Sequence, residues 1–430
     1  MKIIFVENRF KTFFWKKCHE KFLELDSSLQ ISWIVQNHSF SLGEDDFCIE
    51  YPKTRDMNAE KNDFFRDLMK KDRAVYLYGG STSHYSYYYN AIKKYIVSQK
   101  PDFVIGESTL FHELIIIDIC RNLSIPYLHP TSTRYPLGKF SLFLYDTQVP
   151  FEGKKGKFTE EDKEIIDHIV NRKIVPGYMI PSHGLSSLKQ KCYKMLNTFI
   201  SFKSWMFGER YNTPSPLVKL RFNSILSRNI KAFGVLASQA EINDSDYANG
   251  ILFPLQMQPE ANLDVWGAPF NNQLDNLKKL VLVLKENQKV LIKANPKSKY
   301  ELSDEFLRYI QNSDQVLCIG LDVSMQQIFK KVSRIYTVTG TVGIEAVLTG
   351  KLLITESGSP YDGYPNTFVI RGGVLYKTPT KYEKERLVTC PRLNSFFGEI
   401  SDPVYSSTCM SDDNIGKVCT QILTKLRDSL

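Results

Sequence analysis

The chain has 430 residues, of which 43% are hydrophobic and 13% aromatic, and its formal net charge at pH 7 is +8. This composition excludes a disordered or collagen-like protein, and the length predicts two or three domains, most simply two large lobes. The opening MKIIFVENRF is an alternating apolar strand rather than a signal peptide, and charged residues interrupt every apolar run before the roughly 18 residues that a membrane span needs. We therefore expect a cytoplasmic protein.

Residues 1–150 alternate between strand and helix patterns. Strands are expected at 2–7, 30–36, 47–52, 74–79, 102–108 and 125–130, with helices between most of them. A repeated strand-helix-strand order predicts a parallel sheet that is covered on both faces. The first lobe is therefore expected to be Rossmann-like.

The same order starts again at Ala232. Strand patterns at 250–256, 289–296, 315–320, 334–339 and 351–357 alternate with helix patterns, which predicts a second Rossmann-like lobe over residues 232–400. Residues 401–430 contain an amphipathic helix that we expect to cross back over the lobes. Together the patterns predict an α/β protein whose two lobes face each other across a cleft, where ligands bind beyond the carboxyl ends of the strands.

The segment 151–231 between the lobes is predicted to be helical and basic. From Leu188 to Phe233 a single acid, Glu209, stands among aromatic residues and nine cations, which are Lys189, Lys191, Lys194, Lys203, Arg210, Lys219, Arg221, Arg228 and Lys231. Such a stretch fits an anionic membrane surface, an interdomain helix with a solvated face, or, less well, nucleic acid. We expect no nucleic-acid partner.

Nothing in the sequence predicts a metal site. The eight Cys are scattered without a C-x-x-C pair or a neighbouring His, which is typical of reduced and mostly buried thiols. The D-x-D sequence Asp244-Ser245-Asp246 lies in a polar, turn-like context, so we interpret it as a loop.

Polar residues follow three strands of the second lobe. Lys293 and Lys297 bring positive charge to the expected cleft, and Thr339, Gly340 and Thr341 bring hydroxyl and peptide N–H donors to the start of a helix. Such turns also occur for tight turning and helix capping alone. The segments involved are 253–260, 292–298 and 338–345.

Taken together, the three strand ends predict a nucleotide-sugar site. In that site Glu345 is placed to accept hydrogen bonds from ribose hydroxyls.

The sequence resembles a known family at these positions. Three motifs resemble the bacterial capsule polysaccharide biosynthesis family, which includes the retaining β-Kdo transferases of capsule and O-antigen assembly. They are PLQ followed by Pro-Glu, a strand that ends in Lys-x-x-Pro, and TGT-GIEAVL-GK. PDFVIGES and TSTRYPLGKF resemble the N-terminal domain of the same family. The resemblance covers residues 100–145 and 250–360.

The resemblance implies a GT-B fold and a glycosyltransferase without metal or cofactor. The donor would be a nucleotide sugar, with CMP-Kdo in the best-known members, and the acceptor a surface polysaccharide or glycolipid such as lipopolysaccharide, reached from the inner face of the membrane. Gln256 falls within the matching PLQ, and Asn295-Pro296 stands where the family has a His-Pro pair near the donor phosphate. All seven His of this chain precede residue 184.

Glu260 matches a carboxylate that is proposed as the nucleophile in those enzymes. The residue type alone fits a covalent nucleophile, a group that stabilises a cationic transition state, or an ordinary surface residue near a helix start. In the first lobe, Glu107 follows a strand and is a candidate base for an acceptor hydroxyl, with Ser132 and Arg134 as candidate acceptor-binding residues; structural ion pairing is the alternative.

Two other functions remain open at this point. One is a sugar-nucleotide epimerase or hydrolase of the same fold, which would use the same phosphate site without a polymer acceptor. The other is a non-catalytic component of polysaccharide assembly.

Overall fold

The computed structural model describes the chain except residues 42, 44, 45, 59, 61, 174–184, 213, 296, 298, 299, 404, 405 and 407, and except the side chains of 185–190 and 194. The chain divides into two compact units, each of which contains one seven-stranded sheet. The first unit comprises Met1–Lys157, Val175–Pro216 and Cys390–Leu430; the second comprises Phe158–Ile174 and Leu217–Thr389.

The sheet of the first unit has the strand order β14-β6-β5-β4-β1-β2-β3. Its strands from β5 to β3 run parallel, while β6 pairs antiparallel with both β5 and β14. The strands are β1 (Lys2–Val6), β2 (Gln30–Val35), β3 (Phe47–Cys48), β4 (Phe103–Ile105), β5 (Tyr127–Ser132), β6 (Lys139–Leu144) and β14 (Phe396–Phe397).

Helices α1 and α16 contact each other and share one hydrophobic core with this sheet. Phe5 of β1 lies in this core, where its ring stacks on Trp33 at 5.0 Å between centroids, and Phe22 of α1 and Ile422 of α16 are fully buried in it. The unit's helices are α1 (Lys11–Leu25), α2 (Asp63–Lys71), α3 (Arg73–Tyr76), α4 (Tyr85–Gln99), α5 (Phe111–Asn122), α7 (Leu185–Met206) and α16 (Asp412–Asp428), with the 3-10 turns η1 (His38–Phe40), η2 (Thr54–Asp56) and η4 (Thr408–Met410).

The sheet of the second unit has the order β13-β12-β11-β10-β7-β8-β9 and is parallel except between β12 and β13. Its parallel strands are short and mostly buried, as expected for a sheet that is covered on both faces, whereas the antiparallel edge strand β13 is largely exposed. They are β7 (Ile251–Pro254), β8 (Val290–Lys293), β9 (Val316–Ile319), β10 (Arg334–Tyr336), β11 (Leu352–Thr355), β12 (Thr367–Arg371) and β13 (Val374–Lys377).

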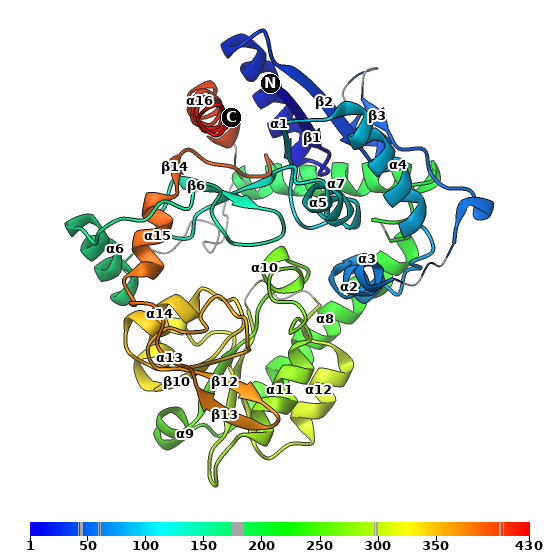
Figure 1. The fold of residues 1–430 in the computed structure, drawn as a ribbon. Helices are drawn as coiled ribbons and strands as arrows, with labels where there is room; N and C mark the ends of the chain where they lie inside the picture. Colours follow the sequence, from blue (N-terminus) through cyan, green and yellow to red (C-terminus); the bar gives the residue numbers. More distant parts are fainter. Residues whose placement is uncertain are drawn as a thin grey trace. The chain divides into compact units, whose positions relative to one another are not determined.

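Alternating side chains of these strands enter two separate cores. Ile251 and Phe253 of β7 pack with residues of α8, α11 and α12, whereas Leu252 packs with residues of α13 and α14. Figure 1 shows α11 and α12 beside the sheet on one side and α13 and α14 on the other. The remaining bounds are α6 (Glu160–Val170), α8 (Pro216–Gln239), α9 (Asp244–Asn249), α10 (Ala261–Asp264), α11 (Gln273–Leu282), α12 (Asp304–Gln311), α13 (Met325–Lys331), α14 (Val342–Leu348) and α15 (Arg386–Leu393).

The structure confirms an α/β chain with two Rossmann-like units. The segment 151–231, which the sequence sets apart as a connection, is shared between both units, and the C-terminal helix α16 contacts α1 of the first unit. The expected strand at 74–79 is wrong, because α3 and a following turn occupy it: the Asp72 carboxylate accepts the N–H of Ala74 at 2.8 Å and so caps a helical turn.

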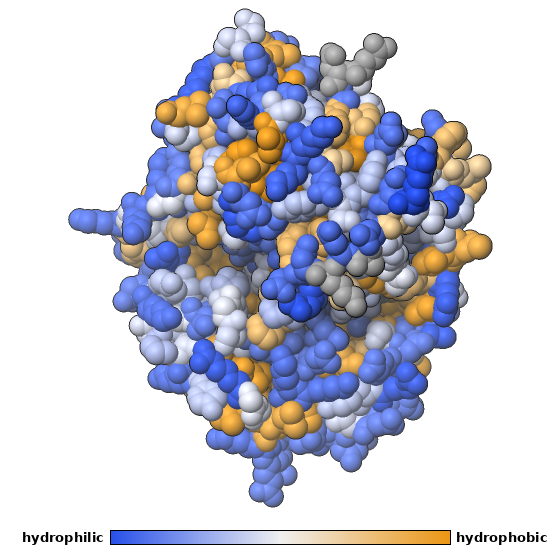
Figure 2. Space-filling view, turned by 45° about the vertical axis from the view of Figure 1, so that its right-hand side comes forward, coloured by the Kyte–Doolittle hydropathy of each residue, from blue (hydrophilic) through white to orange (hydrophobic). Residues whose placement is uncertain are grey.

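The surface is mixed in polarity. Figure 2 shows hydrophilic residues over much of the face that it draws, with smaller apolar groups between them. Across the part of the chain that the structure describes, no helix combines the length and the apolar character that crossing a membrane requires.

Candidate functional site

The second sheet has a topological switch point between β7 and β10. From β7 the chain continues to β8 and β9 on one side, then returns to β10 and β11 on the other side. Loops at the carboxyl ends of two such strands diverge, and ligands of open α/β sheets bind in the crevice that they leave. The loops after β7 and β10 contain the predicted residues Gln256, Thr339, Gly340 and Thr341.

Gln256 joins these two loops. Its side-chain Nε2 donates to Thr339 Oγ1 at 2.9 Å, and its Oε1 accepts from the N–H of Thr339 at 3.3 Å and from Thr337 Oγ1 at 3.4 Å. Thr339 is buried, and its hydroxyl donates to the carbonyl of Asn262 at 2.7 Å. The structure therefore brings Gln256 and Thr339 together as expected, but it uses their polar atoms to hold the two loops to each other.

A second layer of amides, which the sequence analysis missed, supports the loop after β7. The side chain of Gln273 bonds both the N–H (2.8 Å) and the carbonyl (2.7 Å) of Gln256, and it donates to Gln258 Oε1 at 2.9 Å. Gln258 in turn donates to Asp264 Oδ1 at 2.6 Å. Gln258, Asp264 and Gln273 are all buried. The only signal in the sequence is the pair of glutamines in QMQ, two residues apart directly after an apolar strand.

The Thr-Gly-Thr turn is shaped by Tyr361. Its hydroxyl donates to the carbonyl of Gly340 at 2.6 Å, and a Cβ added to Gly343 would clash with its ring. Gly340 donates its own N–H to Thr337 Oγ1 at 3.0 Å. Among the described residues, the N–H groups of Thr341 and Val342 have no hydrogen-bond partner. These two peptide donors are what the turn offers to an anionic ligand.

The two lysines after β8 have different environments. Lys293 is buried and donates through Nζ to the carbonyl of Gly320, at 2.5 Å, in the loop after β9; burial also lowers the pKa of its ammonium group. Lys297 is exposed, and its N–H donates to Asn295 Oδ1 at 2.8 Å. Of the two predicted cations, Lys297 is the better placed for a soluble ligand. Pro296 lies outside the described residues.

Glu345 is held by a cation that the sequence analysis did not identify. Its carboxylate forms an ion pair and a hydrogen bond with the guanidinium of Arg172, which follows α6, and both side chains are largely buried. Burial raises the pKa of the Glu345 carboxyl group, and Arg172 opposes that shift. The Arg172 guanidinium also lies 4.8 Å from the centroid of the Phe329 ring. The carboxylate expected for ribose is therefore engaged within the protein.

Glu260 stands at the start of α10. Its N–H donates to Asp264 Oδ2 at 2.8 Å, so the main chain is fixed by the same buried carboxylate that Gln258 contacts. Glu260 itself is exposed to solvent. Glu260 is thus a solvent-accessible carboxylate on the loop after β7, next to the switch point.

The first sheet has its own switch point, between β1 and β4. Glu107 follows β4, Lys11 opens α1 after β1, and their side chains form an ion pair of 2.5 Å between Nζ and Oε1 with little exposure of either. Glu107 therefore forms the structural ion pair that the sequence analysis gave as the alternative to a role as base. Ser132, at the end of β5, donates through Oγ to the carbonyl of Ile400 at 2.9 Å, and Arg134 is partly buried in the loop that follows.

Close to this switch point, after β1 and β4, lies a group of buried polar residues that the sequence analysis also missed: Glu7, His112 and Asn212. His112 is 3.0 Å through Nε2 from the carbonyl of Glu7, and its Nδ1 is 3.0 Å from Nδ2 of Asn212. Since the amide nitrogen of Asn212 can only donate, Nδ1 accepts and Nε2 carries the proton. Burial lowers the pKa of His112 and raises that of Glu7, which favours this neutral imidazole.

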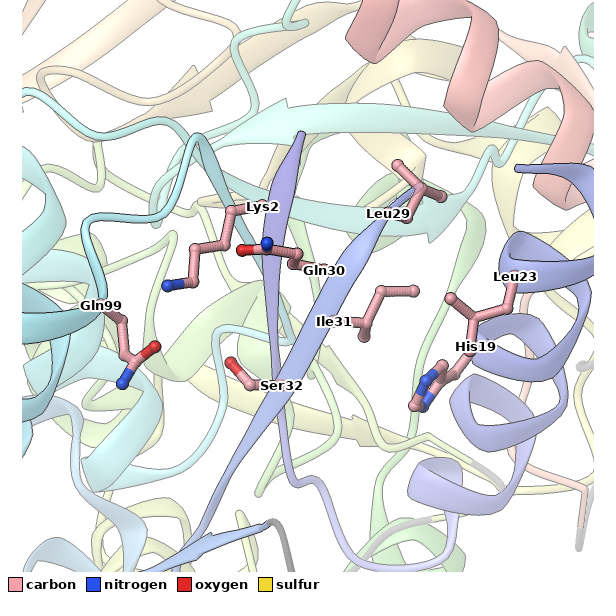
Figure 3. A pocket seen from close by; sticks show the side chains of 8 residues that line it. All are labelled: Lys2, His19, Leu23, Leu29, Gln30, Ile31, Ser32 and Gln99. Carbon is pink, nitrogen blue, oxygen red and sulfur yellow. The ribbon is translucent and has the colours of Figure 1, made fainter. Parts of the chain in front are cut away.

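A cavity of about 420 Å³ lies at the opposite, amino-terminal edge of the first sheet. Figure 3 shows His19, Leu23, Leu29 and Ile31 on one side of β2, with the remaining lining side chains on the other. Because ligands of such sheets bind at the carboxyl edge, this cavity does not correspond to the predicted site.

The described residues contain no group of three or more His, Cys, Asp or Glu placed to hold a metal ion. The D-x-D sequence opens helix α9 instead of lying in a loop as expected. Asp246 accepts the N–H of Asn243 at 3.0 Å as part of a capping box, and Asp244 pairs with Lys331 at 2.8 Å. The eight Cys form no disulfide; five are buried, as expected, and Cys192 is exposed.

Comparison with known protein families supports the resemblance found in the sequence. Residues 210–364, less than half of the chain, match the family model described as "Capsule polysaccharide biosynthesis protein". The match runs from before β7 to beyond β11 and so includes both loops of the second switch point. No curated protein is similar enough in sequence to count as a relative.

Solved structures that match this chain differ widely from it in sequence. The Thermosulfurimonas dismutans KpsC β-Kdo 2,7 transferase is 10% identical over 99% of each chain, with a TM-score of 0.36; the β-Kdo 2,4 transferase of the same organism is 15% identical over 69% of this chain and 82% of that one, with a TM-score of 0.33. The UDP-GlcNAc 2-epimerase of Methanocaldococcus jannaschii, in complex with UDP-GlcNAc and UDP, is 13% identical over 99% of this chain and 100% of that one, with a TM-score of 0.28. With scores of this size, none of them identifies the activity.

Proposed function

We propose that the protein is a glycosyltransferase of capsule or related surface polysaccharide synthesis, which transfers Kdo from CMP-Kdo with retention of configuration. The observation that carries the proposal is the family match over residues 210–364, because it includes both loops of the switch point at which a nucleotide sugar would bind. An epimerase, a hydrolase and a non-catalytic assembly component are the outcomes against which this function is tested.

In the proposed site the second unit binds the donor. Lys297 and the free N–H groups of Thr341 and Val342 supply the donors for the phosphate, while Gln256 and Thr339 fix the distance between the two loops. Asn295 and Pro296 belong to the same loop as Lys297. Glu345 contributes indirectly, by fixing α14 through Arg172.

Glu260 is the proposed nucleophile. Its carboxylate would attack the anomeric carbon as the bond to CMP breaks, and an acceptor hydroxyl would then displace the glycosyl ester, so that two inversions give net retention. Glu107 is the proposed acceptor of the hydroxyl proton, with Ser132 and Arg134 as acceptor-binding residues. No step needs a metal or a cofactor.

Donor binding is tested first. We expect CMP-Kdo to raise the melting temperature of the full chain more than UDP- or GDP-sugars do, because a ligand that binds only the native state stabilises it. Lys297→Gln should weaken binding about 10- to 100-fold, since one charge-assisted hydrogen bond is lost. The matched control is Lys289→Gln, which changes the same residue type at the opposite end of β8 and should leave the affinity unchanged. No response to any nucleotide sugar would contradict a donor site.

The role of Glu260 as nucleophile is tested with the same protein and the same donor. Glu260→Gln should still bind CMP-Kdo but lose transfer by several orders of magnitude, because an amide cannot form the glycosyl ester. Wild-type protein mixed with donor alone should show a one-sugar adduct on the peptide around Glu260 by mass spectrometry. An inverted product, or an adduct elsewhere, would remove Glu260 from this role; free sugar released without an acceptor would favour a hydrolase.

A further inference from the structure

Helix α7 packs on the rest of the first unit through a face that combines two serines with Ile200 and Trp205. Ser204 is buried there, and its hydroxyl lies 2.8 Å from that of Ser39, beside the turn η1 that α7 contacts. Ile200, Ser201 and Trp205 are partly buried around it. This mixed face attaches α7 to the rest of the first unit.

The opposite face of α7 is apolar and open to solvent. Met195, Phe199, Phe202 and Met206 follow one another at intervals of four, three and four residues, so they form one stripe along the helix. Their exposed fractions are 74%, 65%, 46% and 60%. At about 100° per residue, Ser204 lies about 180° from Met195. The helix therefore presents apolar side chains to solvent, where a surface helix usually carries polar ones.

Positive charge surrounds this stripe. The sequence from Leu185 to Gly208 contains four lysines and no acid, and Lys191 and Lys203 are exposed. The next acid, Glu209, is buried, and its Oε1 accepts the N–H groups of Tyr211 at 3.0 Å and Asn212 at 2.8 Å. No negative side chain of this segment therefore reaches the surface that carries the stripe.

We propose that α7 binds in the plane of an anionic phospholipid membrane. The stripe of Met195, Phe199, Phe202 and Met206 enters the boundary between headgroups and acyl chains, and the lysines contact lipid phosphates. Charge complementarity favours this occupant over a second copy of the chain, because a symmetric pair of stripes would bring the lysines of both copies together. The inference does not depend on which sugar is transferred.

The proposed surface is narrower than the basic stretch Leu188–Phe233. Three of the basic and aromatic residues of α8 are engaged with the second unit: Arg228 forms an ion pair of 2.6 Å with Asp304, the Phe222 ring packs on Tyr300, and Phe233 is fully buried. The membrane interpretation therefore applies to α7 alone.

The test uses the full chain and vesicles of phosphatidylcholine with or without phosphatidylglycerol. Cys192 is exposed on α7, whereas the other Cys are buried or half-buried, so an environment-sensitive dye on Cys192 reports on this helix. We expect a blue shift and co-sedimentation with the anionic vesicles only, both reduced by high salt. Lys191→Ser with Lys203→Ser should weaken binding about 30-fold, from about 1 kcal/mol for each basic residue.

The apolar stripe has its own variant and control. Phe199→Ser with Phe202→Ser should weaken vesicle binding on the order of 10²-fold, because both rings lose burial in the membrane. Val235→Ser with Leu282→Ser removes two apolar side chains that are 54% and 73% exposed in the second unit, and it should bind as wild type. Unchanged binding of the phenylalanine variant, or no binding by wild type, overturns the proposal. The proposal is also overturned if the wild-type protein self-associates in sedimentation velocity, the phenylalanine variant does not, and neither protein binds vesicles.

Discussion

At the turn between β10 and α14, the ring of Tyr361 decides which residues fit. The Thr-Gly-Thr sequence predicts hydrogen-bond donors for a nucleotide sugar, yet Gly340 and Gly343 also have a packing reason: a Cβ at Gly340 would lie 2.6 Å from Thr337 Oγ1, and one at Gly343 would clash with the Tyr361 ring. A side chain at Gly343 would meet ring atoms of Tyr361, which is only 3% exposed. The glycines are thus explained by the fold before any ligand is considered.

We expect Gly343→Ala to lower the free energy of unfolding of the second unit by about 1–3 kcal/mol, because the new methyl group overpacks a buried ring. The control is Gly416→Ala in α16, where an added Cβ meets no atom within 4 Å. There the same substitution should raise stability by about 0.5–1 kcal/mol through helix propensity. Urea unfolding measures both, and equal effects of the same sign would contradict the packing explanation.

At the scale of elements, the ion pair between Arg172 and Glu345 attaches the end of α6 to α14. The two residues are 173 positions apart, and the chain between them leaves the second unit and returns to it. Because α14 follows the Thr-Gly-Thr turn, this ion pair also stabilises the position of the predicted donor loop.

Arg172→Ala should destabilise the second unit by on the order of 3 kcal/mol, because it leaves the buried Glu345 carboxylate without its cation. In a Glu345→Gln background, Arg172→Ala should lower the free energy of unfolding clearly less, because no buried charge is then left without its partner. Lys331→Ala breaks the pair with Asp244, whose side chains are 52% and 88% exposed, and should cost much less than Arg172→Ala because water screens the two charges. Thermal unfolding compares wild type with Arg172→Ala, Glu345→Gln, the double variant and Lys331→Ala. Equal losses of stability for Arg172→Ala and Lys331→Ala would show that burial is not the cause.

At the scale of the whole molecule, the chain passes between the two units four times, after residues 157, 174, 216 and 389. The first unit is completed only by the last segment, since Ile422 and Leu426 of α16 are fully buried in the core that contains β1 and α1. The N-terminal half therefore cannot bury its own apolar face without the C-terminal helix.

Ile422→Ala with Leu426→Ala should destabilise the first unit by several kcal/mol, at about 2–5 kcal/mol for each buried side chain removed. Hydrogen exchange is the measurement: amides of β1 and β4 should lose protection, whereas those of β7 and β8 keep theirs. Thr424→Ala, on the exposed face of the same helix, serves as the control. Equal loss of protection in β7 and β8 would mean that the two units unfold as one.

The sequence alone determined most of the regular elements and the likeness to capsule polysaccharide biosynthesis proteins. Period-two and helical apolar patterns depend on neighbours along the chain, so β1, α1, β7, β8 and β10 are readable without tertiary contacts. The expected strand at 74–79 failed because its apolar residues fit a strand as well as a helix, and the cap formed by Asp72 decided between them.

Only the tertiary structure decided what the candidate side chains touch. Lys293 and Lys297 are four residues apart, and the sequence predicts the same role for both. In the structure Lys293 is buried against Gly320, whereas Lys297 is exposed. Glu345 meets Arg172, and α7 presents Phe199 and Phe202 outward while it attaches through Ser204. These outcomes depend on residues far away in the chain, because burial and ion pairing are set by what packs against a side chain and not by its neighbours in sequence.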